Sequence, residues 1–272
     1  MYDLVVCIRC HEQPDFVMDA ADSVLWSVSS DTTKLMFAVD QNRKLAQTLK
    51  DKLHLPVTCS VKRYGWGAGL YGLLVEAIVF AEKEIGFRHF LSIDYDTLFL
   101  QKGADEALLS LIDDPVIGLL GQLTPPNPHW KGVFELQQRI LAEMLVKIPS
   151  AYIPGEGVSG SCMMLTASGI EGLRRGGFLE AKFRDIVDRG ISLADDHLIP
   201  IFIRACGLGI KDTRPHTQCT WFAVGDPYGL EETEVKVFHP AKLVPPLRCP
   251  QRKDELKVRN YFREKRGRRP IK

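Results

Sequence analysis

The sequence of 272 residues lacks any apolar run of eighteen residues, so it predicts no membrane-spanning helix. Its first residues, Met1 to Val6, lead directly into a strand-like segment without a basic stretch ahead of an apolar one, which argues against a signal peptide. Internal repeats are absent, and only the basic C-terminal stretch has a biased composition. We therefore expect a globular, cytoplasmic protein with no transmembrane segment.

Two common nucleotide-binding motifs are also missing. The glycine-rich stretch at residues 65–69, Gly-Trp-Gly-Ala-Gly, has neither the spacing of a dinucleotide fingerprint nor the Gly-Lys-Ser/Thr end of a phosphate-binding P-loop. It does lie between a predicted strand and a predicted helix. Glycine there lets the backbone approach a ligand, and a helix N-terminus favours an anion such as a diphosphate.

The seven cysteines do not form a recognisable metal or disulfide framework. Their number is odd, they are widely scattered, and the one C-x-x-C pair has no second pair at zinc-site spacing. We expect reduced cysteines in the core or the cleft of an intracellular protein. They are Cys7, Cys10, Cys59, Cys162, Cys206, Cys219 and Cys249.

The charge of the chain is unevenly distributed, although the net charge is only +1. Residues 251–272 contain ten Lys or Arg and three acidic residues, a net of +7, which leaves −6 for the rest. Hydrophobic residues make up 45% and charged residues 25%, as is usual for a globular domain. An acidic body with a basic tail is therefore the main compositional feature.

Apolar strands alternate with helical segments through the first half of the chain. The alternation predicts an α/β fold with a mostly parallel sheet and helices on both faces. We expect strands at 4–8, 35–39, 57–61, 90–93 and 116–120, and helices at 15–27, 43–53, 70–83 and 105–112. Further helices are expected at 132–146, 167–175 and 198–206, the last capped by Asp195 and Asp196, and the segment 211–250 is expected to be irregular.

The most informative motif is Asp94-Tyr95-Asp96, which follows the apolar run 90–93. Ionised carboxylates are costly to bury unless they are paired or bind a metal. Two acids at positions i and i+2 of an extended segment point the same way, which suits a divalent cation with oxygen ligands. Taken alone, the pattern is equally compatible with a solvated turn at a strand edge.

Charged residues follow each of the first four predicted strands. Because ligands bind open α/β sheets beyond the carboxyl ends of the strands, these residues together favour a shared cleft. They are Arg9 and His11, Asp40, Lys62 and Arg63, and Asp94 and Asp96.

Two later segments could also carry chemistry. Asp195-Asp196 is either an N-cap pair or a site with a general base held over the cleft by a helix start. His239 stands between an apolar segment and a proline. A neutral imidazole can join two carboxylates around a manganese-type ion, and a hydrogen-bonded structural role is the simpler alternative.

The order of these motifs resembles that of GT-A glycosyltransferases, in particular the inverting, family-2-like type. The resemblance covers about residues 3–240 and has two departures: Asp195 replaces the usual Glu, and Arg9-Cys10-His11-Glu12 replaces the usual end of the first strand. It rests on the N-terminal strand, Asp40, the glycine-rich turn, Asp94-Tyr95-Asp96, the segment 155–165, Asp195-Asp196 and the late His239.

The resemblance implies a metal-dependent transfer of sugar, with inversion, from a nucleoside-diphosphate sugar, a UDP-sugar being favoured, to an acceptor hydroxyl. It implies a GT-A fold whose nucleotide-sugar cleft lies at the carboxyl ends of the strands. The implied donor contacts are Arg9, His11, Asp40, Arg63, Gly65 and Asp94, and the implied ligands of Mn²⁺ or Mg²⁺ are Asp96, Asp94 and His239. Asp196 would deprotonate the acceptor, with Asp195 beside it, and Trp130, Gly160, Ser161 and Trp221 would line the acceptor site.

The resemblance also divides the chain into a donor half, 1–122, an acceptor and catalytic half, 123–250, and the basic tail, 251–272. Three interpretations of the tail remain open: a disordered end, an amphipathic segment on an anionic membrane surface, or a grip on DNA. In the third, Trp66, Trp130 and Trp221 would stack on a flipped base. The acceptor is accordingly a glycan or lipid-linked sugar, or a hydroxymethylated base in DNA.

Two other classes of protein remain as alternatives. A nucleotidyltransferase of sugar phosphates uses a similar sheet and paired acids, but it normally carries an N-terminal glycine-rich loop, which residues 7–14 lack. The second alternative is a non-catalytic protein that binds nucleotide sugars. The presence of both acidic pairs, Asp94/Asp96 and Asp195/Asp196, argues against it.

Overall fold

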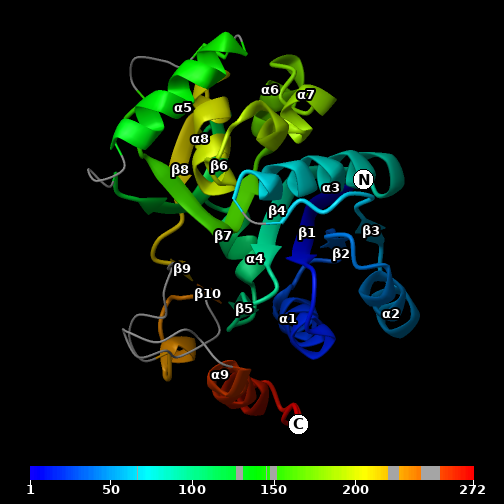
Figure 1. Ribbon diagram of the computed structural model, residues 1–272. Coiled ribbons are helices and arrows are strands. Elements are labelled where there is room, and N and C mark those ends of the chain that lie inside the picture. Colours follow the sequence, from blue (N-terminus) through cyan, green and yellow to red (C-terminus); the bar gives the residue numbers. More distant parts are fainter. Residues whose placement is uncertain (66, 127–130, 145, 148–151, 220–226, 240–251) are drawn as a thin grey trace.

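The computed structural model describes residues 1–65, 67–126, 131–144, 146–147, 152–219, 227–239 and 252–272. Its centre is a seven-stranded sheet of order β3-β2-β1-β4-β7-β6-β8 (Figure 1). The strands are β1 (Tyr2–Cys10), β2 (Thr33–Val39), β3 (Val57–Cys59), β4 (Phe87–Asp94), β6 (Ile117–Thr124), β7 (Gly157–Leu165) and β8 (Gly209–Asp212). A smaller sheet has the order β5-β10-β9, formed by Leu98–Phe99, Val237–His239 and Thr217–Cys219.

The large sheet is parallel except for one strand. β7 pairs antiparallel with both β4 and β6, whereas the pairs β1–β2, β1–β4, β2–β3 and β6–β8 are all parallel. The carboxyl ends of the parallel strands therefore share one edge of the sheet. The predicted mostly parallel α/β sheet is confirmed. Strands β1 to β4, which precede residue 122, and strands β7 and β8, which follow it, belong to this one sheet.

Helices cover both faces because successive residues of each buried strand point to opposite sides. In β1, Leu4, Val6 and Ile8 belong to one apolar cluster, and Val5 and Cys7 belong to the other. The cluster that contains Leu4, Val6 and Ile8 also contains side chains of α1 (Pro14–Ser27), α2 (Arg43–Leu53) and α4 (Ala104–Leu109). The cluster that contains Val5 and Cys7 includes α3 (Gly69–Glu84), α5 (Lys131–Glu143), α6 (Ala167–Arg175), α7 (Ala181–Arg184) and α8 (Asp195–Ala205).

Two details of the sequence interpretation are wrong. Residues 211–250 are not irregular throughout, because β9 and β10 lie within them and β8 ends there. Strands of three residues are too short to show the alternation by which strands are recognised. The helix expected at 198–206 begins instead at Asp195, and its N-cap is Ala194 without a side-chain hydrogen bond, so the two acids are not capping residues.

The basic tail is folded in its described part. Residues Arg252–Lys265 form helix α9, which packs near α1 and the small sheet (Figure 1). The disordered interpretation is therefore wrong for residues 252–272, because acids of α1 pair with arginines that the sequence alone leaves solvated. Within the described residues, we find no helix with the length and apolar character needed to cross a membrane.

Candidate active site

A cleft of about 450 Å³ opens at the carboxyl edge of the large sheet. Its volume lies in the range of small-molecule sites. The cleft collects twelve of the predicted residues: Arg9, His11, Asp40, Arg63, Gly65, Asp94, Asp96, Gly160, Ser161, Asp195, Asp196 and His239. The prediction for Lys62 is wrong, because Lys62 does not line the cleft and its ammonium pairs instead with Asp185 and Asp188. Trp66, Trp130 and Trp221, predicted to contact the acceptor or a flipped base, lie outside the described residues.

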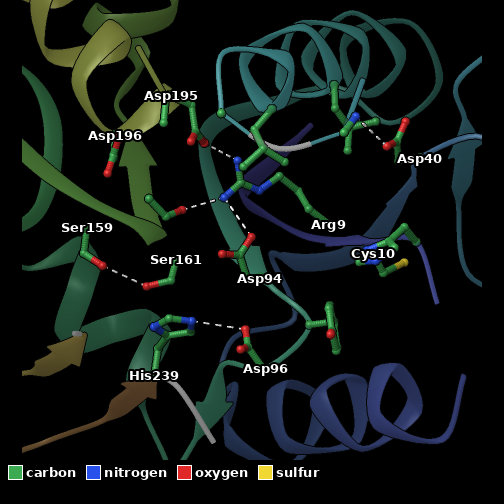
Figure 2. Close-up of a pocket in the computed structure, with 18 of the residues that line it drawn as sticks. Arg9, Cys10, Asp40, Asp94, Asp96, Ser159, Ser161, Asp195, Asp196 and His239 are labelled. Atoms are coloured by element: carbon green, nitrogen blue, oxygen red, sulfur yellow. Dashed lines mark hydrogen bonds and ion pairs between the residues drawn. The ribbon is translucent and has the colours of Figure 1, made fainter. Parts of the chain in front are cut away.

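Asp94, Asp96 and His239 form one cluster in this cleft (Figure 2). One ligand atom from each lies within 4.8 Å of the others, and Nε2 of His239 is 3.1 Å from Oδ1 of Asp96. The fold explains the meeting of residues so distant in sequence. β4 ends at Asp94, the chain turns into β5, and β10 pairs antiparallel with β5, which brings His239 next to Asp96.

The electrostatics of this cluster fit a divalent cation. Burial opposes protonation of His239, but the carboxylates of Asp96 and Asp94 outweigh it and raise the pKa of the imidazole to about 9. Burial also raises the pKa of Asp94, against the opposing effect of Arg9. The raised pKa of His239 reflects the negative charge of the two carboxylates, which a divalent cation would offset in place of the proton. Two carboxylates and an imidazole are ligands that suit Mn²⁺-type ions, so the residues fit the predicted metal.

Arg9 lies at the centre of the cleft and is almost completely buried (Figure 2). Its guanidinium forms an ion pair with Asp195, donates to Asp94 over 2.8 Å and donates to the carbonyl of Gly160 over 2.6 Å. Burial disfavours its charge, but Asp195 and Asp94 raise its pKa above the usual value. One arginine therefore joins β1, β4, β7 and α8 and sets the distance between the two acidic pairs.

We expect Arg9→Met to destabilise the protein by about 3–5 kcal/mol, because it leaves Asp94 and Asp195 buried without their cation. The free energy of unfolding in urea measures the loss. Arg174→Met is the matched control: Arg174 pairs with Glu82 and Glu171 at the surface, where an ion pair contributes about 0–1 kcal/mol. Equal losses for the two variants would contradict the central role of Arg9.

Asp196 differs from its neighbour Asp195. Asp196 is only 5% exposed. Its Oδ1 has no hydrogen-bond partner among the described residues, although Nε2 of His197 lies 4.0 Å away. Burial, together with the charge of Asp195, raises the pKa of Asp196 to about 8, against the opposing effect of Arg9. A buried carboxyl with an unsatisfied oxygen and a pKa near neutrality is typical of a general base.

Asp40 holds the glycine-rich turn at another wall of the cleft. Its carboxylate accepts hydrogen bonds from the backbone N–H groups of Tyr64 and Gly65, at 2.8 and 2.9 Å. Gly65 and Gly67 have φ angles of 68° and 70°, which favour glycine. A Cβ on Gly69 would lie 1.9 Å from the carbonyl oxygen of Tyr64, so the turn needs glycine at the helix start.

Ser159 is a cleft residue that the sequence analysis missed. It is buried, and its hydroxyl lies 2.8 Å from that of Ser161, two residues along β7 (Figure 2). The signal was available, because residues at i and i+2 of a strand share a face. Gly160 lies between them, and a Cβ there would be 3.3 Å from Asp195 and Asp196, so this wall is tightly packed against the start of α8.

The fold and the cleft together define an α/β protein with a ligand site at the carboxyl edge of its sheet and side chains suited to a divalent cation. No protein-family model matches the sequence, and no curated protein is significantly similar to it.

Among solved structures, mouse xyloside xylosyltransferase 1 in its apo form is similar over 88% of this chain and 96% of its own, with 15% identity and a TM-score of 0.45. The mannosyltransferase PcManGT from Pyrobaculum calidifontis, in complex with GDP-mannose and Mn²⁺, is similar over 78% of this chain, with 14% identity and a TM-score of 0.44. This chain covers 55% of that mannosyltransferase. Likenesses of this size leave the reaction to be argued from the residues of the cleft.

Proposed function

We propose that the protein is a metal-dependent glycosyltransferase, which moves a sugar from a nucleoside-diphosphate sugar to an acceptor hydroxyl. One observation carries the proposal: a cluster with cation ligands and a carboxyl with the properties of a base share one cleft of substrate size. The first suits a diphosphate leaving group, and the second suits an attacking hydroxyl. Arg9 holds the two at a fixed separation.

At the donor end, Asp96 and His239 are the proposed cation ligands, with Asp94 shared between the cation and the ribose. A bound divalent cation supplies Lewis-acid neutralisation of the departing diphosphate. Imidazole among the ligands favours Mn²⁺ over Mg²⁺. Arg63 lines the cleft and has no ion-pair partner among the described residues, so its guanidinium is available for a phosphate oxygen.

The nucleoside is proposed to lie against Asp40, His11 and Gly65, with UDP as the favoured carrier. Asp40 lines the cleft while it binds the glycine-rich turn, so it would place the backbone of that turn against the nucleotide. His11 lies with its ring 6.0 Å from that of Tyr95. His11 and Asp40 directly follow β1 and β2, which lie side by side in the sheet.

At the acceptor end, Asp196 is proposed to take the proton of the attacking hydroxyl. The hydroxyl oxygen forms a bond with the anomeric carbon as the bond from that carbon to the diphosphate breaks, and the proton passes to the Asp196 carboxylate. Attack opposite the leaving group inverts the anomeric centre. Asp195 stays paired with Arg9 and orients the start of α8 rather than acting as the base.

We propose a sugar hydroxyl, free or lipid-linked, as the acceptor. Four arginines of the C-terminal segment pair with acids of α1, which leaves less charge for a grip on DNA. They are Arg259, Arg263, Arg266 and Arg268. An acceptor screen that includes oligosaccharides and hydroxymethylated duplex DNA separates the two classes.

The test of the function is incubation with a panel of nucleotide sugars and Mn²⁺. Release of a nucleoside diphosphate from at least one donor, lost in excess chelator, is the expected result. The anomeric configuration of the transferred sugar, read by NMR, tests inversion. Release of pyrophosphate from a nucleoside triphosphate and a sugar phosphate would instead support a nucleotidyltransferase, and binding without turnover would support a nucleotide-sugar binding protein.

A further inference from the structure

Helix α9 lies outside the cleft, yet it contacts the turn that carries two of the three proposed cation ligands. Arg259 of α9 is completely buried. Its Nη2 donates a hydrogen bond of 2.8 Å to the backbone carbonyl of Tyr95, the residue between Asp94 and Asp96. The guanidinium also donates to Asp19 and to the carbonyl of Phe16 in α1.

The apolar side of α9 reaches the third ligand. Val258 and Phe262 pack in one buried cluster with Leu98 and Phe238. Leu98, in β5, comes two residues after Asp96, and Phe238, in β10, immediately precedes His239. The same helix therefore packs against both strands whose pairing brings Asp96 and His239 together.

All three nitrogens of the Arg259 guanidinium donate hydrogen bonds. A buried guanidinium is costly unless its charge is paired and its N–H groups are bonded. Here Asp19 and Glu255 supply the charge at 2.9 and 2.7 Å, and two backbone carbonyls accept the remaining bonds. Because the guanidinium is planar and rigid, fixing it against α1 also fixes the carbonyl of Tyr95.

We propose that α9 is the positioning element of the cation site, and that Arg259 is the residue through which it acts on the Asp94–Asp96 turn. Cation binding and the docking of α9 are then thermodynamically coupled, so each strengthens the other. The proposal rests on the proposed function in one respect, the binding of a divalent cation by Asp94, Asp96 and His239. It assigns the basic tail a role in the body of the enzyme rather than a contact with DNA or membrane.

The test is the dissociation constant for Mn²⁺ of the full chain, measured from the free-ion EPR signal. Arg259→Met is expected to weaken binding by about tenfold, equivalent to about 1.4 kcal/mol. Asp19 keeps Arg263 and Arg266 as partners in this variant, which limits the loss of stability. Arg263→Gln is the matched control, since Arg263 pairs with the same Asp19 but donates its other hydrogen bond to the carbonyl of Arg269 rather than to Tyr95. This variant should bind Mn²⁺ like the wild type.

Amide hydrogen exchange provides a second readout that needs no variant. Mn²⁺ is expected to slow exchange in α9 of the wild-type protein, although α9 supplies no ligand. Equal Mn²⁺ affinity of wild type and Arg259→Met, or exchange in α9 that is unchanged by Mn²⁺, would overturn the proposal. If Arg259→Met fails to fold, the exchange experiment decides alone. A wild-type protein that binds no Mn²⁺ would overturn the proposed metal site itself, which is a distinguishable failure.

Discussion

Asp96→Asn is expected to abolish the Mn²⁺-stimulated release of nucleoside diphosphate, with a fall in rate of about a thousandfold. The reason is that Asp96 contributes a carboxylate to the proposed cation site and lies 3.1 Å from His239. Electrostatic neutralisation of a leaving diphosphate contributes several kcal/mol to transition-state stability, which corresponds to that change in rate. The measurement is the initial rate of diphosphate release at saturating Mn²⁺.

The control for this variant is Asp51→Asn, which removes an exposed carboxylate on α2 that accepts a hydrogen bond from Gln47 and does not line the cleft. Its rate should equal that of the wild type. Asp96→Asn should also lose its response to chelator, because nothing remains to be removed. An Asp96→Asn protein with wild-type, chelator-sensitive activity would show that the cation binds elsewhere.

Asp196→Asn is expected to leave donor and Mn²⁺ binding intact while transfer to the acceptor falls by about 10²–10⁴-fold, the usual contribution of a general base. The amide is nearly isosteric with the carboxyl, so the packing against Gly160 is preserved. Isothermal titration of the nucleoside diphosphate and the single-turnover rate of transfer separate binding from chemistry. Loss of both together would indicate a structural role, and retention of both would exclude Asp196 as the base.

The pH dependence follows from the raised pKa of Asp196. A base acts only when ionised, so the transfer rate of the wild type should rise with pH through about 8 and level off above it. The charged or titratable groups that act on Asp196 or lie beside it are Asp195, Arg9 and His197. Asp196→Asn should remove this limb of the profile.

The stability of the folded protein depends on pH in the opposite direction to the transfer rate. Because the pKa of Asp196 is higher in the folded than in the unfolded state, its contribution to stability is complete below the unfolded pKa and is lost as pH rises through about 8. Asp196→Asn carries no such penalty, so its unfolding midpoint should exceed that of the wild type at pH 9. A midpoint below the wild type at that pH would contradict burial of an ionisable carboxyl.

The central parts of the fold and cleft were predictable because they depend on local patterns. Apolar strands such as β1 and β4 alternate with amphipathic helices, and the carboxyl ends of parallel strands share one edge. Arg9, Asp40 and Asp94 could therefore be assigned to one cleft from their places in the sequence. The link between Asp96 and His239 was harder, since it depends on β5 and β10, which are two and three residues long.

The roles of the charged residues were less predictable than their positions. Arg9 was expected to contact the donor, but its bonds to Asp94 and Asp195 depend on side-chain packing that no sequence period encodes. The three interpretations of the basic tail stayed open for the same reason, and helix α9 contradicts only the disordered one. Ten Lys or Arg residues among the 22 residues of the tail indicate a solvated segment or an anionic partner. Only the fold shows that Asp19 of α1 is such a partner.

The most direct test of the account is anomalous diffraction from crystals soaked with MnCl₂ and UDP. A single Mn²⁺ peak is expected between Asp96 and His239, near Asp94, with the diphosphate on its open side. Asp196 should lie farther along the cleft than the diphosphate, without direct contact with the ion. A Mn²⁺ peak away from these three side chains, or UDP bound outside the cleft, would contradict the account.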